Sequence, residues 1–284
     1  MRQIIEWFSR PGVRGMFLGG VVLLAMLFLG VFADYLAPHD PAQQILAQRL
    51  TGPSRDFPMG TDALGRCVFS RIIHGIRPTL GLSLAVTLAV TLLGTAVGLL
   101  AVSISRLDGL VMRITDCFFA FPPLVLILVT INILGPGLAG LAVALSLPGW
   151  PKYARVARSM ALGQKRKTFV QSARAMGAGR WYIVVHCYLP AVLAPVLTIA
   201  TVGVGAKIVY IAGMGVLGLG VQPPLPEWGG MLCQGLPLLA SAPHVSLFPG
   251  SAIVLASAAF TLSGEGLRDF LDPKGRELEE AWRR

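Results

Sequence analysis

The sequence predicts an all-α, polytopic membrane protein with six transmembrane helices. Of its 284 residues, 54% are hydrophobic and only 13% are charged, whereas soluble domains carry about 25% charged residues. Several apolar runs approach the ~20 residues that a helix needs to cross the hydrocarbon core of a bilayer. Polar segments between these runs hold nearly all the lysines and arginines. The net charge of +10 is therefore explained by membrane topology, without nucleic acid as a partner.

The first span is expected over residues 16–33, after a short basic N-terminus of residues 1–15. A cleavable signal peptide is the alternative. It would have an apolar region of roughly 7–15 residues and a small-x-small cleavage site, which the residues around Ala33 match poorly. We therefore expect a retained transmembrane helix. Residues 34–78 follow as a polar, proline-rich segment with little helical periodicity, and they predict an ordered loop.

Residues 79–270 are expected to form a core of five more helices, over 79–104, 114–134, 138–150, 191–213 and 247–263. The first of these contains a G-x-x-x-G pattern at Gly94 and Gly98, which allows close helix approach in lipid. The second holds Pro122-Pro123, which predicts a kink. The fourth holds Lys207. A lysine at mid-bilayer costs about 2.5–3.5 kcal/mol, so this side chain should face the bundle interior or an aqueous path.

Residues 165–188 form the one long polar stretch between two strongly apolar ones. Phe169, Ala173 and Met176 recur at i, i+4 and i+7 and therefore share one face of a helix. Gly177 and Gly179 then break that helix. A second helical stretch, with Trp181, Val185 and Tyr188 on one stripe, leads to Pro190, which suits the first turn of a new helix. The pattern predicts helix, bend, helix. An amphipathic helix lying on the membrane surface is the alternative.

This loop resembles the cytoplasmic EAA loop in the membrane subunits of bacterial ABC importers. That pattern reads E-A-A-x-x-x-G, nine more residues, then I-x-L-P. Ala173, Gly177, Leu189 and Pro190 match it, whereas Gln171, Ser172 and Cys187 depart from it. In the family the loop docks into a groove on the ATPase subunit. The resemblance therefore implies ATPase-coupling residues here: Phe169, Gln171, Ser172, Ala173, Met176 and Gly177. The missing carboxylate puts in doubt any ion pair at Gln171, but not the helix or the bend.

Three further segments resemble the dipeptide, oligopeptide and nickel branch of these permeases. Residues 60–77 match G-T-D-x-x-G-R-D, S-R and G-x-R, with Cys67 in place of an Asp. Residues 217–229 match L-G-L-G-x-Q-P-P-x-P-x-W-G, the most specific pattern in the chain. Residues 261–273 match N-L-L-G-D-G-L-R-D-x-x-D-P, with Thr261, Ser263 and Glu265 in place of its Asn, second Leu and first Asp. The resemblance thus covers about residues 37–274 and implies the fold of a type I ABC importer permease.

The second of these segments predicts a re-entrant lip on the periplasmic side, within residues 214–246. The stretch is too rich in Gly and Pro for a continuous helix and should be rigid and extended, with a short helix from Met231. We assign four residues to the lip: Gln222, Pro223, Pro224 and Trp228.

Cation counts predict the topology. Of the 24 lysines and arginines, 18 lie in segments 1–15, 105–113, 151–188 and 264–284, and 5 lie in residues 34–78. Because cations accumulate on the cytoplasmic side, both termini, including the tail 271–284, should be cytoplasmic in a bacterial inner membrane. Residues 34–78 would then be periplasmic.

The resemblance implies a permease subunit with several partners: a homologous second permease subunit, two ABC ATPase subunits, an extracytoplasmic substrate-binding protein and membrane lipid. The sequence contains no G-x-x-x-x-G-K-[ST] motif. We therefore expect no enzymatic activity and no cofactor in this chain, with ATP and Mg in the partner subunits. The histidines and cysteines lack metal-ligand spacing. Cys67 and Cys233 are both expected outside, which leaves a disulfide open.

The cargo and the path stay open at this point. Small peptides are the commonest cargo of the branch, but Ala212-Gly213-Met214 looks more like its nickel-type members, so a nickel or metal-chelate cargo is retained. Lys207, Met214 and Asp116 are the candidates for the translocation path. A lysine that reaches a carbonyl or Asp116 for structural reasons is the alternative. An ion-coupled secondary transporter, for which Asp116 is the one candidate intramembrane carboxylate, is the alternative function.

Overall fold

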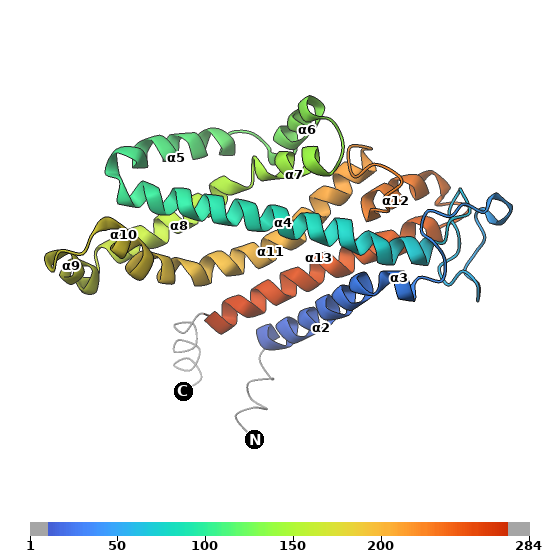
Figure 1. Cartoon of the computed structure of the whole chain (residues 1–284), viewed down its shortest axis with the longest axis horizontal. Helices are drawn as coiled ribbons and strands as arrows, with labels where there is room; N and C mark the ends of the chain where they lie inside the picture. The colour runs from blue at the N-terminus through green and yellow to red at the C-terminus, as the bar shows by residue number, and fades with distance from the viewer. Residues whose placement is uncertain (1–10, 272–284) are drawn as a thin grey trace, which may run out of the picture.

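The computed structural model describes residues 11–271, and over that range the chain is built from helices and loops. Four long helices run lengthwise through the molecule (Figure 1): α2 (Pro11–Val31), α4 (Val68–Ser103), α11 (Leu189–Val216) and α13 (His244–Leu271). The β-structure of the described residues is a single bridge between Thr61 and Cys67. The predicted all-α class is confirmed.

The number of spans is less than the six expected. Four helices are long and apolar enough to cross a membrane, and the third of them is continuous from Arg180 to Val216. Helices α5 (Ser105–Phe119) and α6 (Pro123–Leu134) are bent by 88° and would give a fifth span if they are counted together. Helix α7 (Leu138–Ser146) has nine residues, about 14 Å, which is roughly half the hydrocarbon core. The predicted count of six is therefore not confirmed.

Several helices extend beyond the boundaries that hydropathy predicts. Helix α4 begins at Val68, inside the expected loop, and carries Pro78 in its interior. The expected loop 105–113 is part of α5. Helix α13 runs from His244 to Leu271 and extends beyond both ends of the span expected over 247–263. The expected boundaries follow the apolar runs of the sequence, and polar helical turns lie outside those runs. Hydropathy alone therefore does not predict these extensions.

Close contact between backbones joins α4 to α8 (Trp150–Lys165). A Cβ atom added at Gly94 would lie 2.4 Å from the carbonyl oxygen of Trp150, and one at Gly98 would lie 2.3 Å from that of Ala154. The predicted role of the G-x-x-x-G pattern is confirmed. Helices α2 and α13 also pack closely, since a Cβ at Gly19 would lie 2.5 Å from the carbonyl oxygen of Ala259.

The two ends of the bundle carry different structures (Figure 1). One end holds α9 (Thr168–Ala175) and α10 (Arg180–Ile183). The other end holds α3 (Ala33–Leu36), the 3-10 turn η1 (Leu46–Gln48), α12 (Trp228–Gly235) and the turn η3 (Leu236–Leu238). The start of α2 and the end of α13 lie toward the α9 end, at the left of the view. The loop 165–188 was expected on the cytoplasmic side, and residues 34–78 and 214–246 on the periplasmic side. In the structure the loop 165–188 therefore lies at the opposite end of the molecule from the other two segments.

Candidate functional site

The first candidate site is the loop of α9 and α10, which has the expected helix, bend and helix. Two residues separate α8 from α9. After α9 the chain turns at Gly177, whose φ of +86° favours glycine. Helix α10 then passes through the π-helical turn η2 (Val184–Tyr188) directly into α11. Pro190 therefore lies in the first turn of α11, as expected, but without a break before it.

The outward face of α9 is apolar and has no partner within the described residues. The side chains of Phe169 and Met176 are 52% and 82% exposed. Gln171 and Ser172 are exposed and Ala173 is half-buried. Val170, on the opposite face, is fully buried in the hydrophobic core and holds α9 against the bundle. The residues assigned to ATPase coupling thus form an accessible surface, with Gly177 at its edge.

Arg174 is exposed, but its side chain connects α9 to the end of η2. Its Nη2 donates a hydrogen bond of 2.8 Å to the hydroxyl of Tyr188, which is buried at the end of η2. Sequence reasoning did not identify this contact. The predicted stripe of Trp181, Val185 and Tyr188 is wrong, because the first two are exposed and Tyr188 is buried. A π-turn advances by fewer degrees per residue than an α-turn, so it rotates Tyr188 out of the expected register.

The second candidate site is the lip at the opposite end, where α11 stops at Val216 and the chain is not helical again until α12. Helix α12 begins at Trp228 rather than at Met231, because the Glu227 carboxylate accepts hydrogen bonds from the amides of Gly229 and Gly230, at 2.7 and 2.9 Å. Burial raises the pKa of Glu227, and these two hydrogen bonds oppose that increase.

Trp228 fixes the lip to α4. Its side chain is fully buried and its indole Nε1 donates to the carbonyl of Ile72 at 3.0 Å. Gly75 leaves room for the ring, since a Cβ there would approach it to 2.9 Å. Gln222, Pro223 and Pro224 are exposed. The four residues assigned to the lip therefore divide into one buried anchor and three exposed residues.

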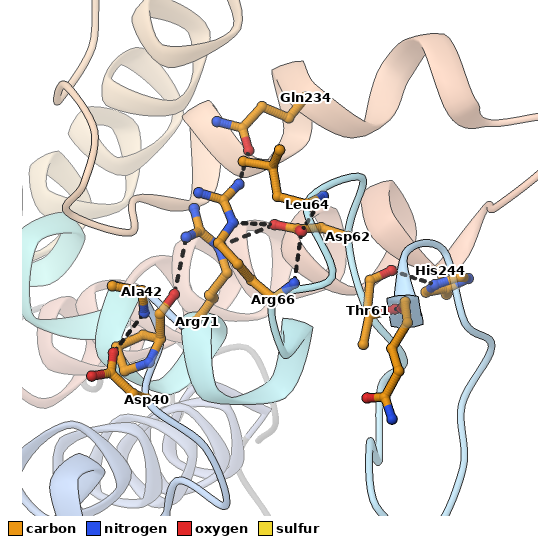
Figure 2. Close-up of polar contacts among 11 residues, drawn as sticks. Asp40, Ala42, Thr61, Asp62, Leu64, Arg66, Arg71, Gln234 and His244 are labelled. Carbon is orange, nitrogen blue, oxygen red and sulfur yellow. Dashed lines mark hydrogen bonds and ion pairs between the residues drawn. The ribbon is translucent and has the colours of Figure 1, made fainter. Parts of the chain in front are cut away.

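A polar network ties the lip to the first loop (Figure 2). The Asp62 carboxylate accepts from Nε of Arg66 at 2.7 Å and lies 3.7 Å from Nε of Arg71. Nη2 of Arg66 donates to Oε1 of Gln234 on α12 at 2.8 Å, and Nη1 of Arg71 donates to the carbonyl of Pro41 at 3.2 Å. Asp62 also accepts from the amides of nearby residues, so it closes a turn and does not cap α4.

Two hollows flank this network. A groove of about 490 Å³ lies between the first loop and the lip, lined by Ala42, Gln44, Ala63, Leu64, Arg66, Pro223, Pro224 and Gln234. A smaller cavity of about 120 Å³ contains Arg71 and Glu227 in its lining. Both mix polar and apolar groups, so this end presents an irregular surface where another protein or a solute can be held.

Comparison with known proteins decides the family. Residues 90–277 match the model of the binding-protein-dependent transport system inner membrane component, and residues 14–53 match that of the N-terminal TM domain of oligopeptide transport permease C. The chain belongs to the family of binding-protein-dependent transport permeases. It is a multi-pass inner-membrane permease, and proteins of this kind act with ATPase and substrate-binding partners.

Relatives of this permease include three curated proteins. It is 39% identical to the glutathione transport system permease protein GsiD of Pectobacterium atrosepticum, covering 90% of this chain and 85% of the relative. It is 37% identical to the dipeptide transport system permease protein DppC of Alkalihalophilus pseudofirmus, over 90% and 84%. It is 38% identical to the di/tripeptide transport system permease protein DppC of Pseudomonas aeruginosa, over 94% and 91%.

The fold of the permease is also similar to a solved one. A chain in an inward-facing structure of the MetNI methionine ABC transporter superposes with a TM-score of 0.59. The match covers 71% of this permease and 96% of that chain, at 22% identity. It therefore supports the fold alone.

The residues assigned to the translocation path are not gathered at one point. Lys207 is buried as expected, with Nζ 5.9 Å from the centroid of the Tyr153 ring. Met214 is fully buried in the core. Asp116 is exposed on α5 and pairs with Arg155, so the suggested contact between Asp116 and Lys207 is wrong. The role of the three residues in a path stays a prediction.

The cysteines are free in the structure. Cys67 is buried and Cys233 is half-buried, and neither forms a disulfide. The disulfide left open by the sequence is therefore not formed. In the described part of the permease, no group of three or more His, Cys, Asp or Glu side chains could hold a metal ion.

Proposed function

We propose that this permease is one of two homologous transmembrane subunits of an ATP-driven importer, completed by two ATPase subunits and an extracytoplasmic binding protein. The observation that carries this is the apolar face of α9 at one end of the bundle. Phe169 and Met176 are too exposed there to stabilise the isolated chain. Large apolar side chains on a short, anchored helix are suited to fill a groove on a partner.

The anchoring of α9 explains how closure of the ATPases could reach the membrane. Val170 and Arg174 fix the helix to the bundle, and the α10–η2–α11 helix is continuous from Arg180 to Val216. A push on α9 is therefore passed to α11 without a flexible joint after Gly179. ATP and Mg are bound by the partner ATPases in this scheme, and this chain supplies the docking surface. An ion-coupled carrier without an ATPase is not favoured, because the chain belongs to the binding-protein-dependent family.

Replacing the docking side chains tests this proposal. In Phe169→Ala/Met176→Ala we expect normal membrane insertion, ATPase association weakened by about ten-fold or more, and a matching loss of uptake. Co-purification of the ATPase subunits and uptake in cells measure the two effects. Ala173→Asp should act in the same way by placing a charge in the contact.

Met160→Ala is the matched control. This substitution also removes an exposed methionine side chain, but from α8, where Met160 is 40% exposed and lies outside the α9 face. ATPase association and uptake should stay near the unmodified level. Unchanged uptake in the Phe169→Ala/Met176→Ala variant would show that α9 does not couple this permease to a motor.

For the cargo we propose small peptides, including the tripeptide glutathione. The support comes from the three relatives reported above, whose names give dipeptides, di- and tripeptides or glutathione. Uptake of labelled dipeptide, glutathione and nickel should be compared in cells with and without the chain. Peptide uptake should depend on the chain; nickel uptake that depends on it, with peptide uptake unaffected, would reverse the assignment.

A further inference from the structure

Helices α5 and α6 form an elbow that is only lightly packed against the rest of the chain. Among the 15 residues of α5 only Thr115 is buried, and in α6 only Ile127 and Ile131 are. The elbow begins after Ile104, an extended residue that separates it from α4. Apolar burial within this chain therefore leaves the position of the elbow weakly determined.

Two ion pairs between α5 and α8 fix the position of the elbow, which apolar packing determines only weakly. The Asp108 carboxylate accepts from Nε and Nη2 of Arg158 on α8, with the second hydrogen bond at 2.7 Å. Eight residues further along α5, Asp116 accepts from Nη2 of Arg155. Bidentate contacts between a guanidinium and a carboxylate fix orientation as well as distance. The partners run in opposite order along the two helices, so the pairs hold α5 antiparallel to α8.

A third contact strengthens the second pair. The guanidinium carbon of Arg155 lies 4.2 Å from the centroid of the Phe119 ring, on the last residue of α5. Arg155 therefore joins both the carboxylate and the ring at the point where the elbow bends. This attraction persists where water is scarce.

Motion of α9 would be passed to α8 as well as to α11, because α8 directly precedes α9 in the chain. The other side of α8 rests directly on the α4 backbone at Gly94 and Gly98. At its C-terminal end only Arg166 and Lys167 separate it from α9. The two ion pairs thus connect the elbow to the helix that directly precedes the proposed docking helix.

We propose that Asp108 and Asp116 are positioning residues that tether the α5–α6 elbow to α8, so that displacement of α9 moves the elbow during transport. The inference rests on the proposed function. Moving α5 away from α8 would separate both ion pairs, and the partly buried Asp108 and Arg158 would then be left without their partners, which is unfavourable. The elbow therefore follows α8.

The test uses the complete importer reconstituted with its ATPases and binding protein. In Asp108→Asn/Asp116→Asn we expect peptide uptake per ATP hydrolysed to fall on the order of five-fold, since one exposed and one partly buried pair each contribute modestly. ATPase association should be unchanged. Reversal of one pair, Asp108→Arg/Arg158→Asp, should recover more uptake than either single substitution. Asp56→Asn, an exposed aspartate in the first loop, is the matched control.

Spin labels give a readout that does not depend on transport. Cys117 on α5 is exposed and can be paired with Met160→Cys on α8, with the other three cysteines replaced by alanine. The distance distribution should stay narrow with and without nucleotide, and should broaden in Asp108→Asn/Asp116→Asn. A narrow distribution in that variant, or unchanged uptake per ATP, would overturn the tether alone. Absence of ATP-driven uptake in the unmodified importer would overturn the proposed function as well.

Discussion

Glu227 shows how a single buried side chain organises the lip. The residue is 2% exposed, and its carboxylate ends inside the protein, against the first amides of α12. Burial of a carboxylate favours its neutral form, whereas hydrogen bonds from amides favour the charged form. Burial is the larger effect here, so the pKa of Glu227 is raised.

This pKa shift predicts how the stability of the permease depends on pH. Because the folded pKa lies above the ordinary value of 4.5, the folded chain binds the Glu227 proton more tightly than the unfolded chain does. The stabilisation is complete below the ordinary pKa and is lost as the pH rises through the folded pKa. Glu227→Gln cannot titrate. The melting temperature of the unmodified protein should therefore fall relative to that of the variant as the pH rises above the ordinary pKa of 4.5.

Glu265→Gln provides the control for this measurement. Glu265 is an exposed glutamate on α13, so its replacement by glutamine controls for the loss of a carboxylate that is not buried. Parallel curves for the unmodified protein and Glu227→Gln would contradict the raised pKa.

At the residue scale, the sequence could predict burial but not partners. The inward orientation of Lys207 follows from the cost of a charge in lipid, and its burial confirms that expectation. The neighbouring Tyr153 ring could not be predicted, since it comes from α8, more than fifty positions earlier. The contact between Arg174 and Tyr188 depends on a π-turn, which neither hydropathy nor helical periodicity predicts.

At the element scale, the α4–α8 contact depends on the absence of side chains. Gly98→Ala would place a methyl group 2.3 Å from the carbonyl oxygen of Ala154. Because backbone atoms cannot move aside as a flexible side chain can, we expect a loss of about 1–3 kcal/mol in stability. Unfolding in a denaturing detergent series would measure it.

Gly81→Ala in the same helix is the matched control. The space around Gly81 is open within 4 Å, so the added methyl group meets nothing. Alanine is the better helix former, and this variant should be as stable as the unmodified protein or slightly more so. Equal losses at Gly81 and Gly98 would mean that helix propensity rather than close packing is being measured.

The elements that hydropathy identified best are those surrounded by apolar sequence. The cores of α2, α4, α11 and α13 follow directly from their composition. The α5–α6 elbow was harder to predict, because α5 begins with the cations and aspartate that suggested a loop. The 88° bend lies between Phe119 and Pro123, at the predicted Pro122-Pro123 kink, but proline alone does not fix the angle.

At the scale of the whole molecule, the separation of the two candidate sites makes a topological prediction. With single cysteines introduced into a background without native cysteine, an impermeant thiol reagent should label Asp56→Cys in intact cells. It should label Ser172→Cys only in inside-out vesicles. Both positions are exposed, whereas the native Cys187 in the α10–α11 segment is buried and unsuited to labelling.

Labelling of Ser172→Cys in intact cells would show that the topology is the reverse of the predicted one. The α9 face would then be beyond the reach of any cytoplasmic ATPase. Labelling of both positions from the same side would contradict the assignment of the two ends to opposite faces of the membrane. Uptake activity of each variant serves as the control for correct folding.

The length of α4 has a mechanical consequence. Its 36 residues extend over about 54 Å, nearly twice the ~30 Å thickness of the hydrocarbon layer. Trp228 contacts the helix at Ile72, close to the end that carries the lip, and α8 packs on it near the other end. A tilt of about 10° around the α8 contact would move the lip end sideways by several ångströms, given the ~1.5 Å rise per residue. Small rotations at the α8 contact are thereby magnified at the lip.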